Sequence, residues 1–251
     1  MNKNNRIKDI IIGVVFILVA GTIIFFLYRG TGSQNRELAR RMAELSPRGG
    51  PPETIDGLRK AIALYEEQIE RNVSEGAQTG VYWKILAIRL ADRSMHQDAL
   101  SALERAIYFN SEDPVLYNLT GVSAGVAAKS IIGFSANADR DRERFFSLSE
   151  KAYLRAIELD NTYTKPMYGL GVLYTFELER PGEAIPHLEN NLRLSPSDIP
   201  AMFVLARAHY MTGGYSQAIE LYERIINRTK DKKIINEALN NIDIIRGLLY
   251  E

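Results

Sequence analysis

A pattern of aromatic, apolar and small residues recurs along this chain of 251 residues and constrains its fold more than any other feature. Its first occurrence consists of Trp83, Leu86, Ala87, Leu90, Ala99, Leu103 and Ala106. It returns from Pro114, Thr164 and Ile199, and so divides residues 80–232 into blocks of 34, 50, 35 and 34 residues. A period of about 20 to 50 residues is typical of solenoids, in which each unit buries its apolar face against its neighbours.

The pattern resembles that of the tetratricopeptide repeat (TPR) family. The resemblance implies an all-α solenoid of antiparallel helix pairs stacked into a right-handed superhelix, with repeats at 80–113, 114–163, 164–198 and 199–232. We further expect a degenerate repeat helix over residues 53–79. Residues 233–251 have apolar side chains at helical spacing, and we expect them to form a capping helix that covers the open end of the solenoid.

Two blocks depart from the 34-residue period. The second block is 16 residues too long, with the excess around residues 129–146, where two apolar clusters flank a charged stretch. This insertion is either an elongated helix and loop or a binding element, and the pattern does not choose between them. The third block has one extra residue, which we place at the turn Arg180-Pro181-Gly182.

An uncharged apolar segment near the N-terminus predicts a single transmembrane helix. Residues 10–28 contain no charge, and 14 of these 19 residues are Ile, Leu, Val or Phe. A helix of that length spans about 28 Å, which is enough to cross a bilayer. Residues 1–9 then form a short cationic tail. Residues 29–52 form a juxtamembrane helix and a linker rich in proline and glycine.

The side of the membrane on which the repeats lie follows less directly from charge. Three basic residues precede the apolar segment and five arginines follow it before residue 49, so counted charge favours a cytoplasmic C-terminal part. A short cationic tail before one apolar span is nevertheless the usual signal-anchor arrangement, and long domains are translocated regardless of charge. We therefore predict a single-pass protein of the cell membrane whose soluble domain is extracytoplasmic, on the periplasmic side.

Composition excludes several classes of function. Lys plus Arg and Asp plus Glu both number 31, so the chain lacks the basic field that nucleic-acid binding needs. There is no cysteine, and the three histidines lie far apart, so we expect no metal site and no cofactor. Residues 121–125 match the G-x-S-x-G motif of serine hydrolases, but no strand precedes them. We therefore predict that the protein is not an enzyme.

The concave face of a TPR solenoid is formed by the first helix of each repeat, and the resemblance implies that a partner binds there. In this chain those positions are apolar and aromatic with a few cationic groups, a mixture that is typical of protein interfaces. The predicted groove residues are Lys84, Ile88, Asn118, Val122, Lys165, Tyr168, Val172, Phe176, Phe203, Arg207 and Tyr210.

These features together predict a membrane-anchored interaction module or scaffold that binds a protein partner or peptide segment in its TPR groove. Single-span repeat proteins resemble accessory factors of bacterial envelope machinery, an analogy that rests on fold and anchor alone. The alternative is a structural protein whose function is self-association, as a homo-oligomer, with the groove unused.

Overall fold

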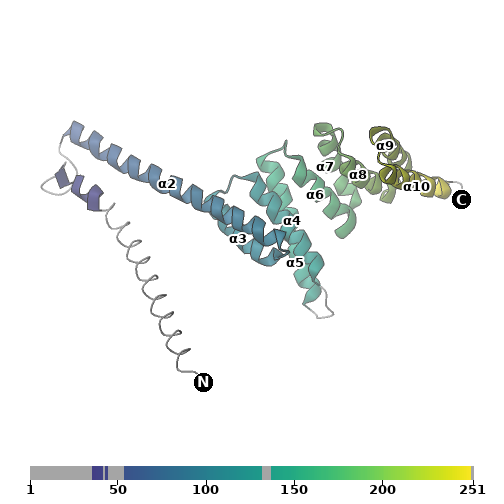
Figure 1. Cartoon of the computed structure of the whole chain (residues 1–251), viewed down its shortest axis with the longest axis horizontal. Coiled ribbons are helices and arrows are strands. Elements are labelled where there is room, and N and C mark those ends of the chain that lie inside the picture. The colour runs from purple at the N-terminus through teal and green to yellow at the C-terminus, as the bar shows by residue number, and fades with distance from the viewer. Residues whose placement is uncertain (1–35, 42, 45–53, 132–136, 250–251) are drawn as a thin grey trace, which may run out of the picture. The chain divides into compact units, whose positions relative to one another are not determined.

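The computed structural model describes residues 36–41, 43–44, 54–131 and 137–249, and every regular element among them is a helix (Figure 1). The chain divides into two compact units, residues 1–74 and 75–251. The helices that are described in full are α2 (Ile55–Asp92), α3 (His96–Phe109), α4 (Pro114–Ser130), α5 (Ala138–Leu159), α6 (Thr164–Val172), η1 (Leu173–Glu177), α7 (Pro181–Leu194), α8 (Ile199–Met211), α9 (Tyr215–Arg228) and α10 (Lys232–Leu249).

Helix α2 is continuous over 38 residues, and this corrects the expectation of a separate helix over residues 53–79. Gly76 and Gly80 lie near the expected break but do not end the helix, because they lie against the end of α3. A Cβ atom at Gly80 would lie only 2.8 Å from the Cβ atom of Phe109. Gly80 therefore permits a close helix approach, and no proline between residues 72 and 80 interrupts the α-helical hydrogen bonds.

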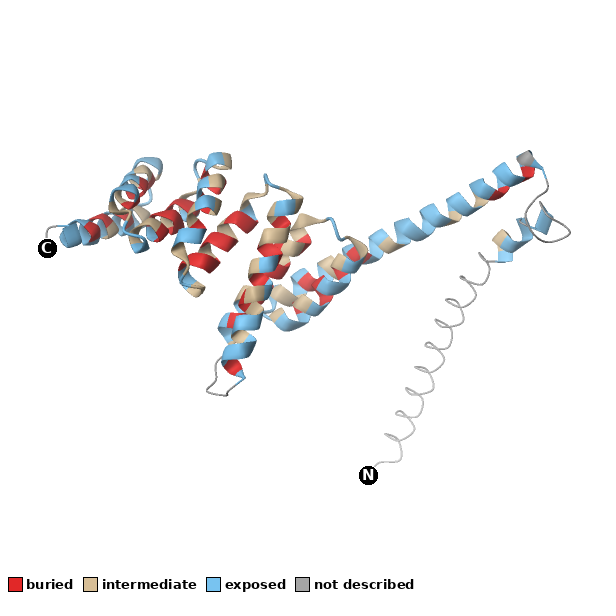
Figure 2. Cartoon of the chain, turned by 180° about the vertical axis from the view of Figure 1, so that it is seen from behind, coloured by how far each residue is buried: buried red, intermediate tan, exposed pale blue. Residues whose placement is uncertain are grey.

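The second unit is a row of helix pairs in which each helix packs on the next along the chain. The residues of α2 from 75 onward pair with α3, and α4 with α5, α6 with α7 and α8 with α9 follow. Among the first helices of these pairs, α6 also contacts both α4 and α8. Figure 2 shows that each of these helices has buried residues on part of its length, with exposed residues between them.

Two groups of buried residues hold this unit together. The smaller one joins α2, α3 and α4 through Ala87, Ala102, Leu103, Ala106 and Leu116. The larger one runs from α4 to α10, where Ala238, Ile242 and Ile245 are buried. Helix α10 begins one residue before the predicted capping segment 233–251 and packs on α9.

The long second block appears in the structure as a pair of extended helices. Helix α4 has 17 residues and α5 has 22. Much of the predicted insertion 129–146 is thus helical, and residues 132–136 lie outside the described part. Phe146 is buried in the larger core group, so this part of the insertion has a structural role.

The extra residue of the third block lies inside a helix, which corrects its expected place at the turn near Arg180. Helix α6 continues into the π-helical turn η1, where the Leu178 N–H donates to the Leu173 carbonyl at 3.0 Å. A π-helical turn holds one residue more than an α-helical turn. The helix therefore absorbs the insertion, and Phe176 on this turn is exposed.

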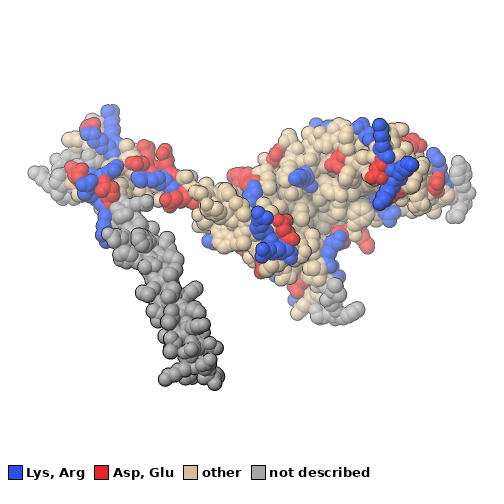
Figure 3. All heavy atoms as spheres, viewed as in Figure 1, with Lys and Arg blue, Asp and Glu red and all other residues tan. Residues whose placement is uncertain are grey.

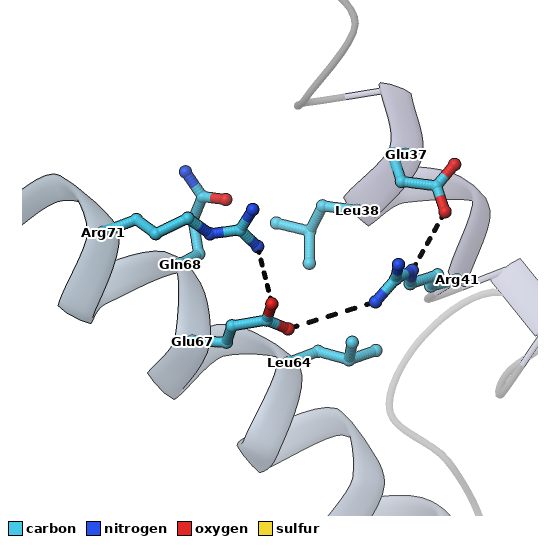
Figure 4. Close-up of a pocket in the computed structure, with 7 residues that line it drawn as sticks. All are labelled: Glu37, Leu38, Arg41, Leu64, Glu67, Gln68 and Arg71. Carbon is cyan, nitrogen blue, oxygen red and sulfur yellow. Dashed lines mark hydrogen bonds and ion pairs between the residues drawn. The ribbon is translucent and has the colours of Figure 1, made fainter.

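In the first unit, residues 36–41 and 43–44 are helical and lie within the segment predicted to be juxtamembrane helix and linker. Figure 4 shows Leu38 of this segment beside Leu64 of α2. Arg41 contacts Glu37 at 2.9 Å and Glu67 of α2 at 3.9 Å. This segment therefore covers one side of α2 within the unit.

Within the described ranges, no helix is both long enough and apolar enough to cross a membrane. The predicted transmembrane helix, residues 10–28, lies outside those ranges.

Candidate functional site

A hollow of about 480 Å³ opens between the first helices of the second, third and fourth helix pairs. Its walls come from α4, α6 and the start of α8, with single residues of α5 and α7 behind them. The lining residues are Asn118, Val122, Tyr153, Thr164, Lys165, Tyr168, Gly169, Val172, Asn191, Asp198 and Pro200.

The floor of the hollow is the ring of Tyr153, which comes from α5 and fills the space between α4 and α6. Two glycines make room for this ring. A Cβ atom at Gly121 would lie 2.5 Å from Tyr153 Cε1, and one at Gly169 would lie 2.6 Å from Tyr153 Cζ. Burial raises the pKa of Tyr153 to about 12, so its hydroxyl stays protonated at neutral pH.

Polar groups lie at the edge of this apolar floor. Asn191 is 1% exposed, and its Nδ2 donates to the Thr164 carbonyl at 3.0 Å. Its Oδ1 is buried and accepts no hydrogen bond from the residues that the structure describes. A buried acceptor without a donor costs free energy, and this oxygen is covered by the surrounding helices.

Tyr168 and Asp198 form another part of the wall. Burial, followed by the charge of Asp198, raises the pKa of Tyr168, so the phenol remains a hydrogen-bond donor at neutral pH. Asp198 also caps α8, because its Oδ1 accepts from the Ala201 N–H at 3.0 Å. Lys165, which is exposed, adds a positive charge at the rim.

The hollow continues into a smaller one of about 150 Å³ that shares Val122, Tyr153, Gly169 and Val172 with it. This second hollow is more apolar and reaches the ion pair between Lys129 and Glu177, whose N–O distance is 2.8 Å. We call the two hollows together the α4–α6 groove. It offers an elongated surface with an apolar middle and charged ends.

Of the eleven predicted groove residues, five line the larger hollow. They are Asn118, Val122, Lys165, Tyr168 and Val172. The others lie elsewhere along the solenoid. Lys84 is bound to Asp113 at 2.8 Å and is therefore not a free cation, and Ile88 lies on α2 beside it. Phe176 projects from the π-helical turn.

The three predicted residues of α8 form an aromatic and cationic group beyond the groove. Phe203 packs on Tyr222 with a ring separation of 5.8 Å, so this side chain also supports the core. The Arg207 guanidinium lies 5.0 Å from the centre of the Tyr210 ring. An arginine stacked on an aromatic ring is a pre-formed contact surface.

The prediction missed the roles of Tyr153, Asn191 and Asp198 in this groove. The repeat pattern places Tyr153 at a position of interhelical packing only, and it does pack there. The Tyr153 ring can be reached from the groove because Gly169 has no side chain. Most other residues at position 169 would cover the ring. The signal that could have shown this is the pair of glycines at 121 and 169.

Ser123 of the G-x-S-x-G match lies inside helix α4, where it is buried. In the described ranges no three His, Asp or Glu side chains are placed to hold a metal ion. Acidic and basic side chains are interspersed over the described part of the face in Figure 3, with broad uncharged areas between them.

Comparisons with known proteins agree with this fold. The tetratricopeptide repeat family profile matches residues 175–239. The crystal structure of YrrB, described as a TPR protein with an unusual peptide-binding site, has a TM-score of 0.56 and 15% identity, covering 72% of this chain and 83% of YrrB. The comparison with curated proteins found no significant match.

A second solved structure gives the same result. TTC0263, a thermophilic TPR protein of Thermus thermophilus, has a TM-score of 0.54 and 14% identity, covering 82% of this chain and 98% of that protein. These likenesses show a TPR-type fold and confirm the helical solenoid predicted from the repeat.

Proposed function

We propose that this protein binds an extended segment of a partner protein in the α4–α6 groove. The observation that carries the proposal is the pair of adjoining hollows over Tyr153, where an apolar floor lies beside Tyr168 and the exposed Lys165. An apolar side chain of the segment would cover the Tyr153 ring, and polar groups of the segment would meet the Tyr168 hydroxyl and the Lys165 ammonium. The first contact removes apolar surface from water, and the second supplies hydrogen-bond partners.

The shape and the shared fold support a peptide over a small metabolite. The two hollows join along the groove and are open to solvent on one side, which suits a chain that enters and leaves. Phenol, amide and ammonium groups at the walls recognise backbone and side-chain polar groups without needing catalysis. YrrB, which shares the fold, is described as having a peptide-binding site, and we propose a similar use of the helical surface here.

Peptide selection followed by one matched pair of variants tests this proposal. A random peptide display library is selected on the full chain in mild detergent, and the affinity of enriched peptides is measured by fluorescence anisotropy. Val122→Arg places a long charged side chain in the groove, whereas Leu148→Arg places it on α5 outside the groove. The two native side chains are 43% and 38% exposed, so neither change disturbs the core.

We expect Val122→Arg to abolish binding and Leu148→Arg to leave it unchanged, with the same helicity by circular dichroism in both. If the enriched peptides bind the Val122→Arg variant as tightly as wild type, the groove is not the binding site. Loss of binding in both variants would also contradict the proposal, because Leu148 lies outside the groove and its replacement should not affect a peptide bound there.

We also propose that residues 10–28 anchor the chain in the cell membrane, with the repeats on the periplasmic side as an accessory factor of envelope machinery. The support is the uncharged apolar length of this segment and the cationic tail before it. Extraction of membranes with alkaline carbonate should leave the full chain in the pellet and release a chain that lacks residues 1–28.

A reporter fusion tests the orientation. A reporter that is active only in the periplasm should be active when fused after Glu251, and activity of a cytoplasmic reporter at the same place would reverse the orientation.

A further inference from the structure

Helix α2 has a row of exposed apolar side chains in the first unit. They are Leu58, Ile62, Tyr65, Ile69 and Val73, and each is between 41% and 65% exposed. The steps between them are four, three, four and four residues, so they lie on one side of the helix. We call these five residues the α2 stripe. The steps of four, three and four from Leu58 to Ile69 follow the heptad spacing of a helix that pairs with another helix.

The side of α2 that residues 36–41 and 43–44 cover is a different one. Gly57 and Ala61 are buried and Leu64 is partly buried on that side, where Leu38 approaches α2 (Figure 4). Each of these positions precedes a stripe residue by one, which is about 100° around the helix. The described residues of the unit therefore cover one apolar side of α2 and leave the stripe exposed.

Two opposite charges flank the stripe on its other side. Arg59 and Glu66 are seven residues apart, hence two helical turns apart on the same side of α2. Neither takes part in an ion pair within the described residues, whereas their neighbours Lys60 and Glu67 pair with Asp56 and Arg71 on the same helix. Arg59 and Glu66 are thus available to another molecule.

A second copy of α2 complements this arrangement in one orientation. If the two helices run antiparallel about a two-fold axis between residues 62 and 65, Ile62 of each copy lies opposite Tyr65 of the other, and Leu58 lies opposite Ile69. The same axis places Arg59 of each copy beside Glu66 of the other copy, so this contact occurs twice in the dimer. In a parallel pair, the heptad spacing would place Arg59 beside the uncharged Thr54, and Glu66 beside Ala61.

We propose that the α2 stripe is a self-association surface through which two copies of this chain pair antiparallel over residues 55–74. Five side chains per copy give a contact smaller than the about 800 Å² per partner of a standard interface. The dimer therefore forms reversibly and its population rises with protein concentration. This surface is separate from the α4–α6 groove, so self-association and peptide binding are tested independently.

Charge exchange tests the pairing. The mass of the full chain in mild detergent is followed by sedimentation velocity over a wide range of concentration. Arg59→Glu and Glu66→Arg each create two like-charge contacts, and we expect each to raise the dissociation constant about threefold to tenfold. The double variant Arg59→Glu/Glu66→Arg restores both pairs and should return the constant to the wild-type value.

Lys60→Glu is the matched control, because it makes the same change of charge on the opposite side of α2. It should leave the dissociation constant unchanged. A double variant as weak as the single ones would overturn the proposal, and so would a wild-type chain that stays monomeric at every concentration. Circular dichroism checks that each variant keeps its helicity.

Disulfide crosslinking tests the orientation directly, since the native chain contains no cysteine. Arg59→Cys and Glu66→Cys chains, one of them carrying an affinity tag, are mixed and oxidised. The antiparallel pair predicts a mixed disulfide between the two chains and little crosslinking of either chain with itself. Crosslinking of Arg59→Cys only with itself, or no crosslinking in the mixture, would overturn the antiparallel pairing.

Discussion

The ring of Tyr153 fills the space that a side chain on residue 169 would need, because a Cβ atom at Gly169 would lie 2.6 Å from Tyr153 Cζ. A Cβ atom on residue 121 would likewise lie 2.5 Å from Tyr153 Cε1. The ring is therefore held between α4 and α6 and has no room to retreat. This contact both packs three helices and gives the groove its floor.

Gly169→Ala should destabilise the protein, although alanine is the better helix former. The added methyl group meets a ring that cannot move, and overpacking of this kind costs about 1 to 3 kcal/mol in the free energy of unfolding. Urea denaturation measures the loss. Gly182→Ala is the control, because no atom lies within 4 Å of the added Cβ, and it should be neutral or slightly stabilising. Equal stability of the two variants would show that the ring can move aside.

Asp198→Ala should lower the free energy of unfolding by about 1 kcal/mol, because the Ala201 N–H at the start of α8 loses its acceptor. Asp198→Asn keeps a side-chain oxygen in the same place and should retain most of the stability. Thermal unfolding of the three proteins distinguishes these outcomes. If the asparagine variant is as unstable as the alanine variant, the negative charge of Asp198 matters more than its hydrogen bond.

The two predicted cationic groove residues should differ in their effect on peptide binding. Lys84 is bound to Asp113 at 2.8 Å, whereas no ion pair is found for Lys165 within the described ranges. Lys165→Gln should slow the association of an acidic peptide obtained by selection, and it should weaken the dependence of that rate on salt. Lys84→Gln should leave the rate unchanged. Stopped-flow fluorescence measures both, and equal slowing would show that Lys84 leaves Asp113 to bind peptide.

The free energy of unfolding should fall as the pH drops below about 6.5, partly because of two histidines. Burial lowers the pKa of His187 and of His209 below the ordinary 6.5, while the nearby Glu183 and Glu189 act in the opposite direction. In this range the unfolded chain binds more protons than the folded one, so acid favours unfolding. Replacing both histidines by glutamine should flatten the dependence between pH 7 and 5, as urea denaturation at each pH would show. An unchanged slope would assign the whole effect to carboxylates.

The repeat could be predicted from the sequence, because helix pairs that bury small and aromatic residues against their neighbours must repeat those residues along the chain. The blocks that begin at Pro114 and Thr164 coincide with the starts of α4 and α6. Several groove residues, among them Val122 and Tyr168, were also predictable, since their place within the repeat decides which side of the first helix they occupy.

The position of the extra residue in the third block could not be predicted in the same way. An extra residue can be absorbed by a turn or by a wider helical turn, and both keep the pattern on either side in register. The choice of the π-helical turn at Leu173–Glu177 depends on how α6 packs against α7 and α8. The continuity of α2 likewise depends on a contact distant in sequence, that of Gly80 with the end of α3.

The sequence by itself determined the all-α repeat architecture and the first-helix positions that face the groove, because these follow from local periodicity. Tertiary structure alone decided that Tyr153 becomes the floor of the groove, that Asn191 Oδ1 is buried without a donor from the described residues, and that Lys84 is held by Asp113. Each of these depends on the distance between side chains from different helices. Such distances are set by the packing of whole helices and are not contained in the spacing of residues along one of them.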